Sequence, residues 1–515
     1  MKKVVIIGAG PSGLSAAYFL LMNSNEYEVI ILEQDSTVGG ISKTINYNGN
    51  RMDLGGHRFF TKKKEINELW KTLLPIQNKP SIDEVILKNN KNYKEGGNDS
   101  EKNDKVLLKR RRVSRIYYHK KFFDYPINLS LKTIKNLGVY DTLLSGISYI
   151  KSIIKKLPEN NLENFYINRF GRRLYEIFFK DYTEKLWGIS PDKIDSSWGS
   201  QRVKGISIKE VIVDYFKRIF KIKDKNKQTS LIESFYYPKY GPGEMYEEMA
   251  INIKKMGGKI NLNSQVIKIK KQENKILSIV YKENDIIKKI EVDYVISSMP
   301  IKDLIESINN VPKKIKRIGS TLPYRDFLTI GLIIDKLKIK NNTKMKTLND
   351  IIPDTWIYVQ SRDVKLGRIQ VFNNWSPYLV KDKNTISLGL EYFCNENDDF
   401  WNKKDLELKE FVKNELVKMD LIDKNCNILD YHVERVKKAY PAYFGSYKDF
   451  PKVKEYLNNI DNLYCIGRNG MHRYNNMDHS IESGIVCANN IINNIKDKEN
   501  IWSINTDIDY HEEEK

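Results

Sequence analysis

The first thirteen residues constrain the fold of this chain more than any other stretch. Val4–Ile7 is a short apolar run of β-branched residues, which is typical of a buried parallel strand. Gly8, Gly10 and Gly13 follow it with the spacing G-x-G-x-x-G. In that spacing the first glycine permits a tight turn, and the second lets the backbone approach a pyrophosphate. The third lets the next helix pack closely on the strand.

The residues that follow complete a dinucleotide-binding pattern. Apolar residues recur at helical spacing after the glycines, which predicts a helix whose N-terminus would point N–H groups at phosphates. A second strand, Val29–Leu32, ends in Glu33, where an acidic residue would bind ribose hydroxyls. A glycine-rich turn in an ordinary α/β domain is the alternative. The order of strand, glycines, helix, strand and acid favours dinucleotide binding.

The length and hydropathy of the chain indicate a globular protein. Its 515 residues are enough for two or three domains with a large core. No apolar run approaches the ~18 residues that a membrane-spanning helix needs. The apolar segment after Lys3 is too short for a signal peptide and runs into the glycines. We therefore expect no transmembrane segment.

Cysteine, histidine and charge limit the partners of the chain. Its four cysteines show no close pairing motif, so a reduced, cytoplasmic protein is expected. Its six histidines lack metal-ligand spacing, so no metal site is expected. The net charge of +20 could indicate nucleic acid or an anionic membrane, but lysine is spread along the whole chain. A phosphate-binding stripe would be local, so we expect no nucleic-acid partner. An acidic small-molecule substrate is compatible with this charge.

The pattern changes along the chain. Residues 88–105 are polar and repetitive, which predicts a flexible surface insertion. Leu129–Leu157 and Asn164–Trp187 carry apolar residues at helical spacing, so a helical region follows. Strands return at Phe235–Pro238 and recur to about residue 450.

Two further glycine motifs point to a family. Gly39 and Gly40 follow the second predicted strand, and Gly55-Gly56-His57 comes after Asp53-Leu54. With the opening fingerprint, this order resembles the FAD-binding segment of the amine oxidase and protoporphyrinogen oxidase superfamily, which includes the UDP-galactopyranose mutases. The resemblance implies an extended FAD, with the Gly55-Gly56-His57 turn against its flavin ring.

A C-terminal signature narrows the resemblance. Gly467–Asp478 precedes a helix with small residues on one face, and a glycine turn at a helix start can hold the polar edge of a flavin. This segment resembles the UDP-galactopyranose mutases closely, and so do Tyr125–Leu129 and Phe178–Gly188. Gly367–Ile369 and Ala439–Pro441 are looser matches to the segments that carry a substrate arginine and tyrosine. The matches follow the order of the family from residue 4 to about 490.

The resemblance implies an α/β flavoprotein with three kinds of domain. A discontinuous Rossmann-like FAD-binding domain would hold an inserted helical domain and a β-sheet substrate domain. The expected boundaries are 1–124 for the first FAD-binding segment, 125–230 for the helical substrate domain, 231–310 for the second FAD-binding segment, 311–455 for the β-rich substrate domain, 456–497 for the third FAD-binding segment and 498–515 for a loose acidic tail.

The resemblance also implies three sets of site residues. The expected catalytic residues are His57, Arg368, Tyr440 and Tyr474. The expected substrate-binding residues are Asn128, Tyr182, Trp187 and Arg202. The expected cofactor-binding residues are Gly8, Gly10, Gly13, Glu33, Gly39, Gly40, Gly55, Gly56, Val266, Gly467, Arg468, Met477 and Asp478.

Other interpretations of these residues stay open. Trp187 and Tyr182 could be core aromatics of the helical domain. Arg368 could pair with a surface acid, and Tyr440 could be a turn aromatic. His57 could be a structural histidine rather than an acid–base group.

The chain also departs from the mutase pattern. Asn476 stands where the mutases carry an acid, and His472 stands where a tyrosine is usual. Arg202 is the nearest candidate for the mobile-loop arginine of the mutases, in a segment that otherwise differs. Because of these departures, the resemblance does not define the exact substrate.

Two functions follow from the resemblance. The first is a UDP-galactopyranose mutase-like enzyme that interconverts pyranose and furanose rings of a UDP-sugar through N5 of reduced FAD, for surface polysaccharide. It would need a reductant, for which NAD(P)H is a candidate, and would show no net redox change. The alternative is an FAD-dependent oxidoreductase that dehydrogenates its substrate by hydride transfer to flavin. A flavin-bearing scaffold without catalysis is a third hypothesis, which the many pocket aromatics disfavour.

Overall fold

Three distant stretches of the chain build one parallel sheet. The computed structural model describes residues 1–89, 93, 96–125, 127, 130–202, 230–231, 234–506 and 513–514. The five strands lie in the order β10-β2-β1-β14-β20, and all neighbours are parallel. Their bounds are Lys259–Asn261 (β10), Tyr27–Leu32 (β2), Lys2–Ile7 (β1), Tyr294–Ser297 (β14) and Leu463–Cys465 (β20). This arrangement confirms the discontinuous Rossmann-like fold, because β1 pairs with β14 and β14 pairs with β20, which are segments about 290 and 170 residues apart in the chain.

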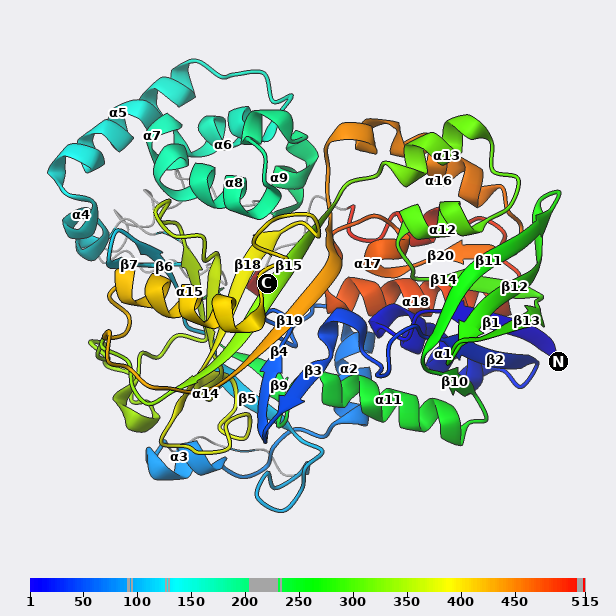
Figure 1. Cartoon of the computed structure of the whole chain (residues 1–515), viewed down its shortest axis with the longest axis horizontal. Coiled ribbons are helices and arrows are strands. Elements are labelled where there is room, and N and C mark those ends of the chain that lie inside the picture. Colours follow the sequence, from blue (N-terminus) through cyan, green and yellow to red (C-terminus); the bar gives the residue numbers. More distant parts are fainter. Residues whose placement is uncertain are drawn as a thin grey trace.

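Helices cover this sheet and bring the two ends of the chain together. α1 (Pro11–Asn23) contacts both α11 (Gly243–Lys255) and α18 (Met477–Ile492) (Figure 1). The approach of α18 to α1 is close, because a Cβ added at Gly484 would lie 2.2 Å from Ser15 Oγ and 2.4 Å from the Ser12 carbonyl oxygen. The small-residue face predicted for α18 is therefore the face that packs on α1.

A second sheet of seven strands stands beside the first. Its order is β19-β15-β18-β17-β16-β6-β7, and every neighbouring pair is antiparallel except the parallel pair of β16 and β6. The strands are β6 (Ser114–Tyr118), β7 (Lys121–Asp124), β15 (Tyr324–Ile334), β16 (Trp356–Val359), β17 (Arg368–Val371), β18 (Ile386–Cys394) and β19 (Ile428–Pro441). The hairpin of β6 and β7 lies before residue 124 in the chain, yet it forms the edge of this sheet rather than belonging to the parallel one.

Helices between residues 131 and 202 cover one end of the second sheet (Figure 1). They are α4 (Leu131–Leu137), α5 (Val139–Ile154), α6 (Leu162–Phe170), α7 (Arg172–Tyr175), η2 (Glu176–Lys180), α8 (Asp181–Trp187), η3 (Pro191–Lys193) and α9 (Ser196–Arg202). Their interior is aromatic, with Phe170 stacked on Phe179 at 4.5 Å between ring centroids. The periodic apolar segments of the sequence are therefore helices, as expected.

The remaining elements connect these two sheets and the helical region. They are η1 (Gly40–Ser42), β3 (Thr44–Tyr47), β4 (Asn50–Asp53), α2 (Lys64–Leu73), α3 (Ile82–Ile86), β5 (Leu107–Arg111), β8 (Ser230–Leu231), β9 (Ser234–Pro238), β11 (Ser264–Gln272), β12 (Lys275–Glu283), β13 (Ile286–Glu291), α12 (Ile301–Ser307), α13 (Lys313–Ser320), η4 (Leu348–Asp350), α14 (Phe372–Trp375), α15 (Asp405–Lys418), η5 (Gly445–Asp449), α16 (Phe450–Asn458), α17 (Gly467–Gly470), α19 (Glu499–Trp502) and β21 (Glu513–Glu514). None of the described helices is both long and apolar enough to cross a bilayer.

The C-terminal segment is packed as far as residue 506. Ile501 and Trp502 are buried against the parallel-sheet core. One nitrogen of Arg473 donates to the carbonyl oxygens of Trp502 and Ile504, at 2.5 and 2.7 Å. The expectation of a loose tail after Asp497 is therefore wrong for residues 498–506, because two apolar side chains of the tail join the core.

The predicted insertion 88–105 lies partly outside the described residues. Where it is described, the backbone of Asn98 bonds to Ile76 and Asn78. Ser100 is buried. The stretch around residues 98–100 therefore lies against the first domain.

Candidate functional site

One cavity of about 1060 Å³ is lined by residues from both large sheets. Most of the predicted site residues line it: Gly8, Gly10, Glu33, Gly40, Gly55, Gly56, His57, Val266, Arg368, Tyr440, Arg468, Tyr474, Met477 and Asp478. Sites for one small molecule are commonly about 300–1,000 Å³, so this space is large enough for a cofactor together with a substrate. The structure thus brings the opening glycines, the closing turn and the candidate catalytic residues to one place.

The opening glycines meet Glu33 at one end of the cavity. Glu33 Oε2 accepts from the N–H of Ala9 at 2.6 Å, and Oε1 accepts from the N–H of Asp35 at 2.9 Å. Burial raises the pKa of Glu33, and these two bonds oppose that rise. The carboxylate is therefore fixed beside the fingerprint turn. The N–H of Gly39 also donates to Ala9, at 2.8 Å, which holds the second glycine pair against the first.

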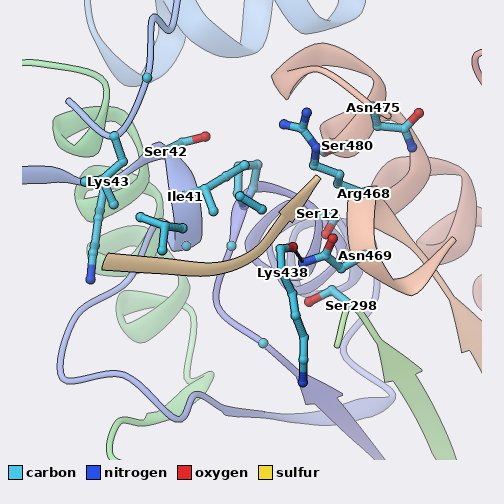
Figure 2. A pocket seen from close by; sticks show the side chains of 18 of the residues that line it. Ser12, Ile41, Ser42, Lys43, Ser298, Lys438, Arg468, Asn469, Asn475 and Ser480 are labelled. Atoms are coloured by element: carbon cyan, nitrogen blue, oxygen red, sulfur yellow. Dashed lines mark hydrogen bonds between the residues drawn. The ribbon is translucent and has the colours of Figure 1, made fainter. Parts of the chain in front are cut away.

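The closing turn lies directly beside the start of α1. A Cβ added at Gly467 would lie 2.3 Å from Ser12 Oγ, and the N–H of Gly467 donates to Ser483 Oγ at 2.9 Å. Met477 and Asp478 are the first two residues of α18 and are both buried. Figure 2 shows Ser12, Ser298, Arg468 and residues after Gly40 around the same pocket. Two long helices thus begin at this cavity, where their N-terminal N–H groups favour an anionic ligand.

Arg468 has hydrogen-bonding capacity that the described protein does not use. Its Nε and Nη2 are buried and have no hydrogen-bond partner among the described residues. The guanidinium carbon lies 4.1 Å from the ring centroid of Tyr474. A buried guanidinium without acceptors is unfavourable, so these donors indicate an acceptor supplied by a bound molecule.

His57 lies next to this charge and is neutral. Burial, and then the nearby Arg468, lower the pKa of His57 to about 4. Its Nδ1 is also buried, and no described group bonds to it. The turn before it is closely covered, because a Cβ at Gly56 would lie 1.6 Å from Cζ3 of Trp356. Only glycine fits at position 56, because the ring of Trp356 covers the turn that precedes His57.

Arg368 on β17 is held by a polar network at the other end of the cavity. Its Nε donates to Tyr182 Oη at 2.6 Å. Its Nη1 lies 3.2 Å from both Glu391 Oε2 and Tyr440 Oη. Glu391 is fully buried, so the acid that pairs with Arg368 is an internal one rather than a surface residue. Burial alone lowers the pKa of Arg368, but Tyr182, Tyr440 and Glu391 raise it well above its ordinary value.

Aromatic rings surround Arg368 and continue to Arg468. The guanidinium carbon of Arg368 lies between 4.8 and 5.9 Å from the ring centroids of Tyr182, Trp356, Phe393 and Tyr440. Tyr440 stacks on Tyr474 at 5.5 Å, and both rings also face Arg468. His57, Arg368, Tyr440 and Tyr474 therefore all line one cavity, in which rings alternate with two guanidinium groups.

Some predicted site residues lie elsewhere. Trp187 does not line the cavity, because it is buried against Trp198 and Phe444 at 5.6 and 6.4 Å between centroids. The position of Trp187 therefore fits the alternative that it is a core aromatic of the helical domain. Tyr182 does not line the cavity itself, but it contacts two residues that do, through its bond to Arg368 and its ring contact with Tyr358. Gly13, Gly39 and Gly467 lie behind the lining residues rather than among them. Asn128 and the side chain of Arg202 lie outside the described residues.

The sequence analysis missed several residues that shape the site. Ser298 follows β14 at the carboxyl end of a parallel strand, which is where such sheets bind ligands. Glu391 is a lone acid in the otherwise apolar strand β18. Both signals were available from the sequence. Trp356 had no such signal, because only the folded chain brings its ring onto Gly56.

The described residues contain no candidate metal site. No group of three histidine, cysteine, aspartate or glutamate side chains there could hold a metal ion.

Comparisons with known proteins agree with this geometry. Residues 11–492 match the family of flavin containing amine oxidoreductases. A stretch of 72 residues is 36% identical to coproporphyrinogen III oxidase of Staphylococcus aureus (strain NCTC 8325 / PS 47). This stretch is 14% of the chain and spans only 16% of that relative.

Solved structures of the same overall fold include a mutase and two oxidases. A reduced UDP-galactopyranose mutase superposes with a TM-score of 0.76 at 21% identity, over 97% of this chain and 96% of that one. A protein from Exiguobacterium sp. 255-15, assigned as a protoporphyrinogen oxidase, gives 0.66 at 15% identity over 95% and 98% of the two chains. A putrescine oxidase bound to putrescine gives 0.59 at 14% identity over 96% and 99%. At these identities the likeness shows the fold alone.

Proposed function

The chain belongs to the family of flavin containing amine oxidoreductases and is a flavoenzyme, and on that premise we propose that it interconverts ring forms of a UDP-sugar. The residues that line the cavity fit FAD. The N-termini of α1 and α18 suit its pyrophosphate and the polar edge of its ring, Glu33 suits a ribose, and the unused donors of Arg468 suit its acceptor atoms. When reduced, FAD supplies the electron pair for this chemistry.

The chemistry of the substrate end carries the proposal. Around Arg368 the cavity is lined by Phe327, Trp356, Tyr358, Tyr440 and Tyr474, and the acid that bonds to Arg368, Glu391, is not among the lining residues. A guanidinium binds the oxygens of a diphosphate through two parallel hydrogen bonds, and aromatic faces stack on bases and sugar rings. A cationic amine would instead need a carboxylate there. The lining therefore favours an anionic, ring-bearing substrate.

The side chains around Arg368 set its role. Glu391 and Tyr440 hold one nitrogen and Tyr182 holds another, so the guanidinium is oriented before a substrate arrives. The stacked rings of Tyr440 and Tyr474 lie beside Arg368 and would be near the diphosphate in this proposal. Burial and Arg468 lower the pKa of His57 to about 4, which disfavours the imidazolium at pH 7, so in this proposal His57 packs against the cofactor and is not a general acid.

A second function rests on a separate observation. The 72-residue match is to a coproporphyrinogen III oxidase, and a porphyrinogen is a large ring that carries carboxylates. Aromatic side chains and one arginine would also bind a large ring that carries carboxylates. In this alternative the substrate reduces the flavin and an oxidant is consumed.

One experiment separates the two functions. The FAD-loaded protein is reduced with dithionite, or with NAD(P)H, and incubated with UDP-galactose before the sugar nucleotides are separated. We expect a furanose product from the reduced enzyme and none from the oxidised enzyme. If no product forms and coproporphyrinogen bleaches the oxidised flavin, the second function is correct.

A matched pair of variants tests the role of Arg368. Arg368→Lys keeps the charge and loses the planar fork, so we expect KM for the UDP-sugar to rise at least about tenfold. Flavin content should be unchanged. Arg172→Lys, at an exposed arginine of α7, should leave KM as it is. An unchanged KM in Arg368→Lys would contradict a diphosphate contact.

A further inference from the structure

The apolar side chains of α5 face away from the protein. Val139, Leu143, Ile147, Ile150 and Ile154 are between 51% and 80% exposed. They follow one another at intervals of four, four, three and four residues, so they form a single stripe along the helix. We call these five residues the α5 stripe. Single exposed apolar residues are common, but a contiguous stripe of large ones on a monomer marks a binding surface.

The buried residues of α5 are small and polar, and two serines of the helix bond to backbone groups. Ser145 and Ser152 are the buried residues of the helix. Ser148 Oγ accepts from the N–H of Arg173 at 3.0 Å. The guanidinium of Arg173 pairs with Asp141. An ordinary surface helix buries its apolar side and exposes its polar side, whereas α5 does the opposite. The α5 stripe is therefore not part of the described core.

Basic residues frame the stripe. Residues 131–156 contain five lysines and one acid, Asp141, which is the acid that pairs with Arg173. Lys135, Lys151 and Lys155 are exposed. Leu131 of α4 is exposed as well and adds apolar area beside the stripe. This combination is typical of helices that lie in the surface of an anionic bilayer.

We propose that the α5 stripe and its lysines dock the protein on an anionic membrane surface. α5 has 16 residues, and no described helix can span a bilayer, so the helix would lie in the plane of the headgroups. Charge favours this occupant over a second copy of the chain, because two such faces would bring lysines against lysines. α5 lies at the outer edge of the helical region, away from the parallel sheet (Figure 1).

Vesicle binding by the FAD-loaded, full-length chain tests the proposal. Vesicles of phosphatidylcholine are compared with vesicles of phosphatidylcholine mixed with phosphatidylglycerol, and bound protein is measured by sedimentation. We expect binding to the anionic vesicles only, and we expect it to weaken as salt rises. Wild-type protein that stays in the supernatant with both kinds of vesicle would overturn the proposal.

Matched variants assign the binding to the stripe. The triple variant Leu143→Ser, Ile147→Ser, Ile150→Ser changes only exposed side chains, so its flavin absorbance should equal that of wild type. We expect its vesicle binding to fall at least tenfold. The double variant Ile286→Ser, Ile287→Ser changes exposed residues of β13, at the far side of the molecule, and should bind vesicles as wild type does.

Sedimentation equilibrium without lipid measures the oligomeric state and tests whether a second copy of the chain covers the α5 stripe. A wild-type dimer that the triple variant converts to monomer would show that a second copy covers the stripe, and the membrane proposal would be wrong. Equal vesicle binding by wild type and the triple variant would also overturn it.

Discussion

The two arginines of the cavity differ in what the protein itself gives them. Arg368 has a buried carboxylate and two tyrosine hydroxyls as acceptors, so it is oriented in the free protein. Arg468 contacts aromatic faces, but Nε and Nη2 have no acceptor among the described residues. We therefore propose that Arg368 is oriented before a substrate binds, and that Arg468 completes its hydrogen bonds with the cofactor.

Replacing Arg468 should separate flavin binding from stability. Arg468→Met removes donors that bond only to a ligand, so we expect FAD affinity to fall roughly tenfold to a hundredfold. The free energy of unfolding of the flavin-free protein should stay the same or rise, because an uncompensated buried charge is lost. Flavin titration and urea unfolding of the flavin-free protein measure the two effects.

Arg473 provides the control for this variant. Its guanidinium holds the carbonyl oxygens of Trp502 and Ile504, so Arg473→Met should destabilise the flavin-free protein and leave FAD affinity nearly unchanged. If Arg468→Met behaves in the same way as Arg473→Met, Arg468 is structural and does not bind the cofactor.

His57 should make the flavin-free protein sensitive to acid. Its pKa is about 4 in the folded protein, against an ordinary value of 6.5, because of burial and Arg468. Between these values the unfolded chain binds the proton and the folded chain does not, so stability falls as pH falls. Relative to His57→Gln, wild type should lose up to about 1.4 kcal/mol per pH unit in this window. Parallel unfolding free energies for the two proteins across the window would contradict the shift.

At the scale of elements, α8 joins the helical region to the second sheet. The Nζ of Lys185 donates to the carbonyl oxygens of Val359, Ser361 and Leu366, at 3.2, 2.6 and 3.1 Å. The same helix carries Tyr182, whose hydroxyl oxygen accepts a hydrogen bond from Arg368. Lys185 thus fixes α8 against the second sheet, and the same helix carries the tyrosine that bonds to Arg368.

Lys185→Met should loosen that junction. Three carbonyl oxygens lose their donor, so we expect a loss of about 1–3 kcal/mol in the free energy of unfolding. We also expect a higher KM for the substrate. Lys193→Met, at an exposed lysine of η3, is the control and should change neither quantity. Normal KM in a destabilised Lys185→Met would show that α8 does not position Arg368.

Lys185 also gives the junction a pH dependence. Burial lowers its pKa to about 8 from an ordinary 10.5. Between these values the unfolded chain binds more protons, so the stability of wild type should rise with pH. Lys185→Met should lack this rise, which denaturant unfolding of the two proteins across the window would measure.

At the scale of the whole molecule, the cavity depends on contacts between the two ends of the chain. α1 and α18 pack closely at Gly484, and Gly467 lies on Ser12 at the start of α1. The chain between them supplies the second sheet, whose strands β15, β16, β17 and β19 line the cavity from the other side. A change at the packing of the two ends should therefore affect the cofactor site as well as stability.

Gly484→Ala tests this coupling. The new Cβ would lie 2.4 Å from the Ser12 carbonyl oxygen and 2.8 Å from the Ala16 backbone nitrogen, so α18 must move away from α1. We expect a loss of about 1–3 kcal/mol in stability together with weaker FAD binding. Gly146→Ala, in α5, adds a Cβ with nothing within 4 Å and should stabilise the protein by about 0.5–1 kcal/mol. If Gly484→Ala is destabilised but binds FAD with unchanged affinity, the packing of α18 on α1 does not affect the cofactor site.

Local patterns in the sequence determined the nucleotide end of the site. The spacing of Gly8, Gly10 and Gly13, with Glu33 at the end of the next strand, has its meaning within about thirty residues. Each of these residues acts on backbone close to it in the chain, so the pattern could be interpreted without knowing the rest of the fold. The same holds for the turn at Gly467 and the start of α18.

Only the tertiary structure decided which face of each element is used. Periodicity identified an apolar face on α5 and aromatics around Trp187, but it could not show that the first points outward and the second into the core. Nor could it show that Arg368 on β17 faces Glu391 on the neighbouring strand. The pattern of a segment sets which residues share a side, whereas the partner on that side is chosen by burial among segments distant in the chain.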